Sequence, residues 1–406
     1  MGQQSRMSRV FMSIMNVPPS ATLLLGITAL PAQQPDTSVS RVVVPGVTHR
    51  HLVFNRGPWS VNVLEVDLKH AELTVGAARA EDRFTGREKV SSIVARSSTD
   101  TTVVVGAVNA DFFNLATGEN ENNQVLAGEV WKALRVTAAP ADSHHTVHSQ
   151  FGITTKQQPV IDRFAIRGVV MPGRGGALPL DAVNAWPDSN AFVLYTNRIS
   201  LMSPADSVGR HQTMVPLASV GRHGDTLLYR IVGRPRTYGA SLSAGAAIAA
   251  GGRGVVRLAA LGDSGATVRV VIGFTPDRGP LREVVGGWPR LVVHGRSVAD
   301  SADAMEGTFP RFSGIRHPRT GVGFSKDSTI LYLITVDGRQ ESSSGMSLVE
   351  FGDLMLSLGV YEGLNLDGGG STTMVVEGTI INRPSDPDGE RTVGNALLVI
   401  QRKPRS

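Results

Sequence analysis

The sequence predicts an α+β protein: β-rich, with mixed sheets, a few flanking helices and an inserted β-rich subdomain. The chain has 45 glycines among 406 residues, which is typical of a fold with many turns. Short runs of alternating or β-branched residues recur along it, whereas helical periodicity is confined to two segments. A hydrophobic content of 41% and a charged content of 18% indicate a globular protein. The length allows two or three domains, or one domain with a large insertion.

The first 32 residues resemble a signal peptide. Arg6 and Arg9 supply positive charge, Ala21 to Leu30 form a short apolar run, and small and polar residues follow at Pro31–Gln34. We therefore expect export to the periplasm or the extracellular space. The alternative is a disordered N-terminal extension. No segment approaches the roughly 18 apolar residues that a membrane span requires, so no spanning helix is expected.

The segment 33–149 is predicted to form the N-terminal half of a catalytic domain. Alternation over Ser60–Leu68 predicts a strand, and Thr85 with Glu88 suggests a capping box that begins a helix over about 86–97. The β-branched run Thr102–Val108 predicts a buried strand that ends at Asn109 and Asp111.

Residues 150–282 are predicted to form the inserted β-rich subdomain. Short strands such as 191–195 and 226–232 are separated by Gly, Pro, Ser and Asp turns, and few residues there suggest chemistry.

The segment 283–406 is predicted to complete the catalytic domain. A strand over 330–336 ends at Asp337-Gly338-Arg339, and a short strand near 363–366 ends at Asp367. Between them, Ser347 and Glu350 form a capping box for a helix over 347–358, and Gly359 is placed to end it. Strands over 372–376 and 395–400 follow.

Charge and cysteine content exclude several function classes. The formal charge of +5 comes from 34 arginines and only 6 lysines, scattered along the chain, and aromatic residues make up 5%. A nucleic-acid-binding protein would cluster such charges among aromatic residues, so no nucleic-acid partner is expected. The absence of cysteine excludes disulfides, thiolate metal sites and cysteine nucleophiles.

Three predicted strands each end close to an aspartate: Asp111, Asp337 and Asp367. Ligands of mixed α/β proteins often bind where strands end and loops diverge, and converging carboxylates suit acid–base or glycosyl-transfer chemistry. A single aspartate before glycine is more often a turn residue. Three in equivalent positions favour the catalytic interpretation.

The run Gly368-Gly369-Gly370-Ser371 allows a close approach of backbone to a ligand. It is not a nucleotide-binding P-loop, because it has no lysine and a strand rather than a helix is predicted to follow. An anionic leaving group would require arginines, and Arg316, Arg319, Arg339 and Arg391 are near these loops in sequence. His317 precedes Pro318, in a predicted extended loop, and is the weaker candidate for a base.

Two other types of site have weaker support. Asp386, Asp388 and Glu390 around Gly389 resemble half of a calcium loop, but their spacing fits a polar turn better. No metal ligand and no definite cofactor is assigned, and a divalent cation such as calcium is left open. A serine nucleophile lacks the Gly-x-Ser-x-Gly elbow.

Several motifs together resemble those of the phosphodiester glycosidase family. Asn109-Ala110-Asp111-Phe112-Phe113 resembles its Asn-Gly-x-Phe-Phe signature, with Ala110 in place of glycine. Gly286–Val292 resembles its Gly-Gly-x-Pro segment, and Arg316–Gly323 resembles its Arg-x-Pro-Arg-Thr-Ala motif. Asp337–Arg339, Gly345–Glu350, Asn365–Ser371 and Arg391–Ala396 follow in the family's order. The resemblance covers about residues 100–115 and 283–400, and more loosely 41–100.

The resemblance implies hydrolysis of a sugar-1-phosphodiester, similar to an N-acetylglucosamine-1-phosphodiester, or of a related envelope or exopolysaccharide linkage. Asp367 would be the base or nucleophile-side carboxylate, with Asp337 or Asp111 as its partner. The substrate-binding residues would be Asn109, Arg319, Arg339, Asn365, Gly369, Ser371, Arg391 and Asn395. Of these, Arg319 and Arg391 would hold the phosphate, and the asparagines would bind sugar hydroxyls or orient the carboxylates.

The expected partner is therefore a carbohydrate or sugar-phosphate substrate, and the oligomeric state is not predicted. Two alternatives stay open at this point. One is a glycoside hydrolase acting on neutral polysaccharide, and the other is a non-catalytic polysaccharide-binding protein of the cell envelope.

Overall fold

The computed structural model describes residues 34–135, 148–204, 212–237 and 239–403. The predicted signal peptide lies outside this part of the chain. Residues 33–406 form one compact unit.

Two antiparallel sheets form the part of the fold that carries the C-terminal motifs. One has eight strands in the order β1-β2-β3-β23-β22-β24-β20-β21, and the other has five in the order β26-β25-β6-β28-β4. The eight are β1 (Thr37–Val44), β2 (Val47–Phe54), β3 (Trp59–Asp67), β23 (Ile330–Val336), β22 (Arg319–Phe324), β24 (Glu362–Asn365), β20 (Arg290–Val293) and β21 (Arg296–Ser297). The five are β26 (Thr379–Ile380), β25 (Met374–Val376), β6 (Thr102–Asn109), β28 (Asn395–Arg402) and β4 (Leu73–Arg79).

These two sheets pack face to face around a common core. Leu64 and Leu333 from the eight-stranded sheet lie in one buried cluster with Val105 and Leu397 from the five-stranded sheet. Successive side chains of a strand point to opposite faces, so the neighbouring residues of β3 and β23 pack on the outer side.

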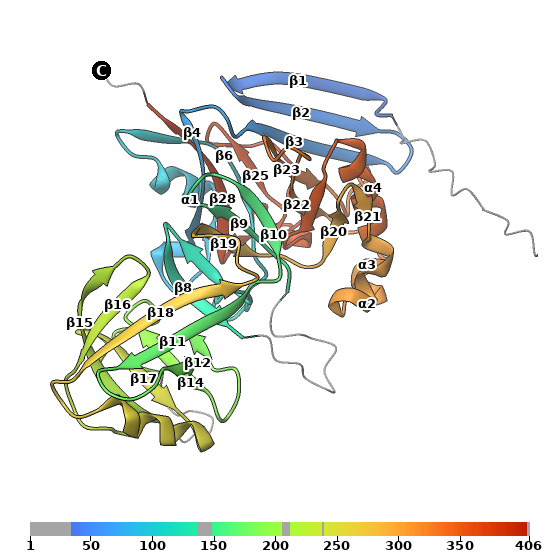
Figure 1. Cartoon of the computed structure of the whole chain (residues 1–406). Coiled ribbons are helices and arrows are strands. Elements are labelled where there is room, and N and C mark those ends of the chain that lie inside the picture. Colours follow the sequence, from blue (N-terminus) through green and yellow to red (C-terminus); the bar gives the residue numbers. More distant parts are fainter. Residues whose placement is uncertain (1–33, 136–147, 205–211, 238, 404–406) are drawn as a thin grey trace, which may run out of the picture. The chain divides into compact units, whose positions relative to one another are not determined.

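Helices cover the outer faces of this sandwich. The helix α4 (Leu348–Ser357) packs through Phe351 and Leu354 on the eight-stranded sheet. The helix α1 (Val90–Ser97) packs through Ile93 and Val94 on the five-stranded sheet. The layers are therefore helix, sheet, sheet, helix (Figure 1). The remaining helices are α2 (Ala302–Glu306), α3 (Pro310–Ser313) and the 3-10 turns η1 (Ala80–Asp82), η3 (Ala299–Ser301) and η4 (Gly369–Ser371).

A third sheet of thirteen strands is formed largely by the middle of the chain. Its order is β10-β9-β19-β7-β8-β13-β14-β17-β15-β16-β18-β11-β12. The strands are β7 (Gln124–Leu126), β8 (Glu129–Leu134), β9 (Gln150–Thr154), β10 (Pro159–Asp162), β11 (Ala165–Pro172), β12 (Leu178–Leu180), β13 (Ala182–Val183), β14 (Phe192–Thr196), β15 (Thr213–His223), β16 (Thr226–Ile231), β17 (Gly245–Ala250), β18 (Thr267–Thr275) and β19 (Leu281–Gly286). A separate pair joins β5 (Glu88–Lys89) to β27 (Thr392–Val393).

Nine of these strands, from β8 to β12 in the sheet order, curl into a barrel. Strands that are distant in the order touch each other, β11 against β8 and β12 against β14, which requires the sheet to roll up. Phe192, Leu217 and Val270 from three of its strands lie in one buried core. The 3-10 segment η2 (Gly252–Leu261) contributes Leu258 and Leu261 to this core.

The predicted β-rich fold with few helices is confirmed, with two differences in detail. The helix predicted over 86–97 begins only at Val90, and Glu88 is not its capping partner because it lies in β5 and binds Arg96. The only parallel pairing among the described strands is β13 with β14, so the sheets are almost wholly antiparallel. The inserted subdomain stays a prediction, since β7, β8 and β19 run from the flanking segments into the same sheet.

The helix α4 begins and ends as the sequence predicts. The Ser347 side chain accepts a hydrogen bond from the Glu350 N–H, and the Glu350 carboxylate accepts one from the Ser347 N–H. Gly359 has φ +91°, the left-handed conformation that ends many helices. Within the described residues, no helix has the length and apolar character needed to cross a membrane.

Replacing the cap tests this account of α4. We expect Ser347→Ala to lower the free energy of unfolding by about 1 kcal/mol, since the Glu350 N–H in the first turn loses its acceptor. The matched control is Ser357→Ala, near the exposed end of the same helix, which should change little. Urea unfolding of both variants measures the difference, and equal effects would contradict the capping account.

Candidate active site

The three predicted catalytic aspartates come to one edge of the sandwich. The end of β6 pairs with the start of β28, and the end of β23 pairs with the start of β22. The end of β24 lies beside the same part of β22. The Asp367 N–H donates to the Ala110 carbonyl at 2.9 Å, which joins the edges of the two sheets.

The side chain of Asn109 connects the strand ends at this edge through hydrogen bonds. Its side chain is fully buried, and its Nδ2 donates to the Asp367 carbonyl at 2.6 Å. Its Oδ1 accepts from Thr320 Oγ1 at 2.8 Å and from the Thr373 N–H at 3.1 Å. Because both ends of the amide are engaged, this arrangement favours a role for Asn109 in holding Asp367 rather than in binding sugar.

The triple glycine forms the tight turn η4 directly after Asp367. Gly369 has φ +61°, and its N–H donates to the Pro318 carbonyl at 2.9 Å. A Cβ on Gly370 would lie 2.1 Å from Arg391 Nη2 and 2.2 Å from Asp386 Oδ1. Glycine is therefore required at both positions, one for its conformation and one for the close approach of an ion pair.

Asp367 carries a perturbed carboxyl. Burial raises its pKa to about 6, and the Ser371 side chain, the charge of Arg391 and the Gly368 N–H oppose that rise. A carboxyl with a pKa close to neutrality suits proton transfer.

Asp111 is more deeply buried, at 2% exposure. Its carboxylate accepts from Asn122 Nδ2 at 2.8 Å and from the Asn122 N–H at 3.1 Å. Burial nevertheless raises its pKa to about 7, against the hydrogen bonds from Asn122 and the charge of Lys132. Gly286 lies against this carboxylate, since a Cβ there would be 2.1 Å from Oδ1.

Asp337 follows β23 and is held by a third set of donors. Its carboxylate accepts from the Arg383 N–H at 3.0 Å, from Ser60 Oγ at 3.2 Å and from Asn382 Nδ2 at 3.3 Å. Burial raises its pKa in spite of these bonds. The strand ends therefore meet at one edge, while each of the three carboxylates has its own hydrogen-bond donors.

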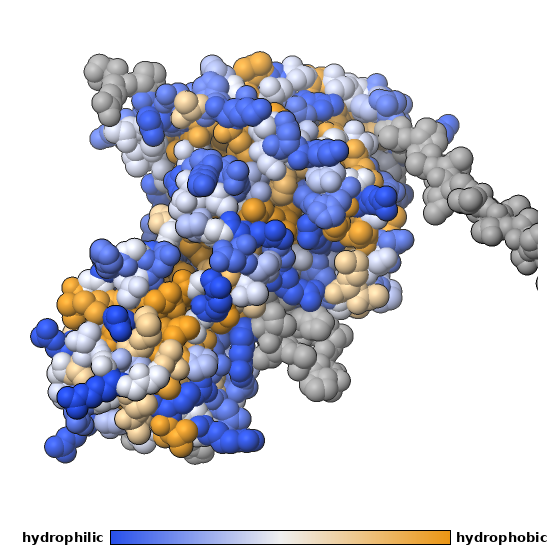
Figure 2. Space-filling view, viewed as in Figure 1, coloured by the Kyte–Doolittle hydropathy of each residue, from blue (hydrophilic) through white to orange (hydrophobic). Residues whose placement is uncertain are grey.

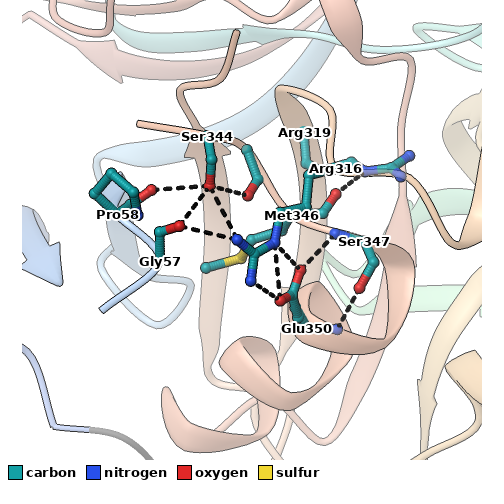
Figure 3. Close-up of polar contacts among 9 residues, drawn as sticks. Gly57, Pro58, Arg316, Arg319, Ser344, Met346, Ser347 and Glu350 are labelled. Carbon is teal, nitrogen blue, oxygen red and sulfur yellow. Dashed lines mark hydrogen bonds and ion pairs between the residues drawn. The ribbon is translucent and has the colours of Figure 1, made fainter. Parts of the chain in front are cut away.

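Arg319, predicted to hold phosphate, is almost fully buried. Its Nε donates to the Met346 carbonyl, and its Nη2 donates to the carbonyls of Phe312 and Ile315. Burial and the charge of Arg339 lower its pKa to about 10. Arg316 makes a two-oxygen ion pair with Glu350 and donates to the Gly57 carbonyl, as Figure 3 shows. These contacts favour a role for both arginines in joining loops to the start of α4.

Arg339 and Arg391 lie against the glycine turn. Arg339 is exposed, and its Nη2 would be 3.1 Å from a Cβ on Gly369. The same Nη2 lies 3.3 Å from His317 Nδ1, and burial followed by the charge of Arg319 lowers the pKa of His317. Arg391 pairs with Asp386 through Nε at 2.7 Å and Nη2 at 3.0 Å. Arg339 is thus the arginine of the predicted set that combines exposure with a position beside the turn.

The other predicted polar residues line the same edge. Asn365 donates through Nδ2 to the Trp288 carbonyl at 2.6 Å, and Asn395 accepts through Oδ1 from the Asp111 N–H at 2.9 Å. Asn395 therefore orients the backbone of Asp111, and Asn365 orients that of Trp288. Within the described residues, Asn365 Oδ1 and Asn395 Nδ2 are buried without a hydrogen-bond partner.

An aromatic cluster beside Asp111 was not predicted as part of the site. Trp288 stacks on Phe312 at 4.8 Å between ring centres, and Phe112 meets both rings edge-on. Phe309, 44% exposed, lies against the same two rings. The signal in the sequence is the spacing Phe309-x-x-Phe312, which brings one ring immediately before α3 and one ring within it. Such rings could stack on a sugar.

The segment that resembled half of a calcium loop is a turn with its own partners. Asp386 binds Arg391, and Glu390 accepts from the Ser91 N–H and hydroxyl. Over the described ranges, no group of three or more His, Cys, Asp or Glu side chains is arranged to hold a metal ion.

Comparison with known proteins agrees with these motifs. Residues 224–400 match the family model described as phosphodiester glycosidase. The resemblance to this family is confirmed. The match includes Asp337, Asp367 and the glycine turn, whereas Asn109 and Asp111 lie outside it.

Known relatives are similar over short segments. Over 114 residues the chain is 33% identical to N-acetylglucosamine-1-phosphodiester alpha-N-acetylglucosaminidase of Bos taurus, covering 26% of this chain and 21% of the bovine protein. Over 85 residues it is 42% identical to the SPbeta prophage-derived uncharacterized protein YomE of Bacillus subtilis, covering 21% of this chain and 13% of that protein. This chain thus spans only a minor part of the length of these relatives.

A solved structure agrees with the fold over most of the chain. The crystal structure of a hypothetical protein from Synechocystis has a TM-score of 0.72 at 18% identity. The similarity covers 90% of this chain and 64% of that chain. At this identity it supports the fold and not an activity.

The different surroundings of Arg319 and Arg339 can be tested by unfolding. Arg319→Ala is expected to lower the free energy of unfolding by about 2–4 kcal/mol, because the buried guanidinium is lost and the carbonyls of Met346, Phe312 and Ile315 lose their donor. Arg339→Ala, at an exposed position, serves as the matched control and should change it by less than about 0.5 kcal/mol. A small effect of Arg319→Ala in denaturant titrations would show that this side chain does not hold the loops.

Proposed function

We propose that this chain hydrolyses a sugar-1-phosphodiester, with Asp367 as the carboxylate that activates water or attacks the anomeric carbon. The observation that carries the proposal is the turn after β24. It presents a carboxyl of pKa about 6 next to Arg339 and Arg391, so that a proton acceptor and cations are neighbours. The similarity to the bovine N-acetylglucosamine-1-phosphodiester alpha-N-acetylglucosaminidase supports this substrate class.

The reaction breaks the bond between the anomeric carbon and the phosphate oxygen. Water adds to the anomeric carbon, its proton passes to Asp367, and the electron pair of the broken bond leaves on the phosphate. A phosphate monoester is a good leaving group, so stabilising its charge contributes more than protonating it. Asp111, with its pKa of about 7, is the partner that retains a proton at neutral pH.

Phosphate recognition is assigned to Arg339, with Arg391 beside it. Arg319 donates to three carbonyls from a buried position, whereas Arg339 is exposed next to the Gly369 backbone. A guanidinium can bind two phosphate oxygens in one plane. The exposed ring of Phe309 and its neighbours Phe312 and Trp288 would then form the wall on which the sugar stacks.

Export to the periplasm or extracellular space is also proposed, on the basis of the signal-like residues 1–32. Expression of the full chain in a bacterial host tests this. We expect a mature N-terminus close to Gln33 in the exported fraction, and an uncleaved cytoplasmic protein would contradict it.

Turnover of defined substrates tests the assignment of Asp367. We expect Asp367→Asn to lower kcat on N-acetylglucosamine-1-phosphodiesters by about 100-fold or more, because the amide cannot accept a proton. Arg339→Ala should raise KM for these substrates and leave a neutral aryl glycoside unaffected. Near wild-type turnover by Asp367→Asn would refute the assignment, and equal activity on neutral glycosides would favour an ordinary glycoside hydrolase.

The pH profile follows from the two carboxyl pKa values. Asp367 acts when deprotonated, so kcat/KM should rise as the pH increases through about 6. Asp111 acts when protonated, so kcat/KM should fall as the pH increases through about 7. The expected profile is a bell with its maximum between these values. Loss of the falling limb in Asp111→Asn, with the rising limb kept, would identify the acid, and a flat wild-type profile would contradict both roles.

A further inference from the structure

A cavity of about 660 Å³ lies in the barrel, separate from the carboxylate edge. Its lining comes from one end of almost every barrel strand, including Val130 of β8, Thr196 of β14, Tyr229 of β16 and Phe274 of β18. The segment η2 packs into the barrel core and contributes no residue to this lining. The cavity is therefore the mouth of the barrel, at the end away from η2. Barrel mouths are common ligand sites, and this volume suits a small molecule or a short oligomer.

The floor of the cavity is apolar and its rim is polar. Val125, Val183 and Phe274 belong to the buried barrel core and form part of the cavity lining. Polar residues, among them Asn197 and Asp225, surround the opening. Figure 2 shows hydrophobic residues among hydrophilic ones on the exposed face of the barrel strands.

The charges of the lining are balanced. Three acidic residues face three arginines, namely Glu129, Asp225 and Asp277 with Arg167, Arg222 and Arg278. Most are already paired, as in Arg167 with Asp277 at 3.1 Å and Glu129 with Arg198 at 2.5 Å. The site therefore offers no excess positive charge to a phosphate or a polyanion. The ligand that suits it is neutral.

Unpaired polar groups also line the cavity. Tyr229 is 6% exposed, and its hydroxyl has no hydrogen bond within the described part of the chain. Burial, with the charge of Glu129, raises the pKa of Tyr229 to about 12, so the hydroxyl keeps its proton. The side chains of Asn197 and Asp225 at the rim likewise have no partner there. Together they provide a hydroxyl, an amide and a carboxylate, which can both donate to and accept from the hydroxyls of a sugar.

We propose that this barrel mouth is a second binding site, for a neutral oligosaccharide. An apolar floor with donors and acceptors around it matches the two faces of a pyranose ring, and the balanced charge favours an uncharged chain. The site is independent of the hydrolytic residues. It would hold a polysaccharide chain on the enzyme while the carboxylate edge acts elsewhere.

Calorimetric titration with neutral tetrasaccharides (chitotetraose, cellotetraose and maltotetraose) tests the proposal on the chain carrying Asp367→Asn, which prevents turnover. We expect at least one to bind. Gly273→Leu should weaken that binding by about tenfold or more, because Gly273 lines the cavity and an added Cβ is 3.6 Å from its nearest neighbour, Arg167. The matched control is Gly176→Leu, at a glycine with nothing within 4 Å and outside the lining.

A second variant guards against a folding defect. The exposed pair Asn197→Ala and Asp225→Ala, combined in one chain, should also weaken binding, and an unchanged melting temperature would show that the fold is kept. The proposal is overturned if no tetrasaccharide binds, if the pocket variants bind as well as the control, or if only a hydrophobic dye such as anilinonaphthalene sulfonate enters the cavity. The experiment measures binding and not turnover. Failure of the binding-site proposal can therefore be distinguished from failure of the proposed hydrolysis.

Discussion

The hydrogen bonds of Asn109 and Ala110 to the backbone of Asp367 hold the end of β6 against the exit of β24. These two strands belong to different sheets, and their side chains meet in the shared core of the sandwich. This link fixes the Asp367 end of the glycine turn, and the pairing of β25 with β6 holds the chain beyond it. The position of Asp367 thus depends on one buried amide whose donor and acceptor are both occupied. A polar group buried in this way is costly unless it is hydrogen-bonded, and both Nδ2 and Oδ1 of Asn109 have partners.

Burial sets the chemistry of this edge. The pKa values of Asp111, Asp337 and Asp367 are all raised, and desolvation is the largest cause for each. The hydrogen bonds from Asn122 and the charge of Arg391 reduce the rise without cancelling it. The extent of burial also distinguishes the roles of two arginines. Buried Arg319 donates to carbonyls and stabilises loops, while exposed Arg339 is available to an anion.

Local signals in the sequence predict much of this fold. Strands β6 and β23 and the helix α4 are predicted nearly to the residue, because each combines a clear period with a clear end. The predicted start of α1 is wrong because Glu88 pairs with a residue of β27 in a short sheet instead of forming a local capping box. The positions of the three aspartates at strand ends are likewise predicted, and the family resemblance is confirmed. The contact of Arg319 with the Met346 carbonyl and the meeting of Phe112 with Trp288 and Phe312 join distant segments, and local periodicity does not encode such contacts. The order of the thirteen-stranded sheet could not be predicted for the same reason, since β7 and β8 pair with strands that lie far along the chain.

The central claim is that the turn after β24 holds Asp367 as a carboxyl poised for proton transfer. Carbon-13 NMR of the aspartate carboxyl groups measures this directly, with the Asp367 resonance assigned by its loss in Asp367→Asn. The account predicts an apparent pKa of about 6 for Asp367. Arg391→Ala should raise this pKa further, because the charge of Arg391 favours the ionised form. A pKa near the ordinary value of an exposed aspartate, about 4, would contradict it.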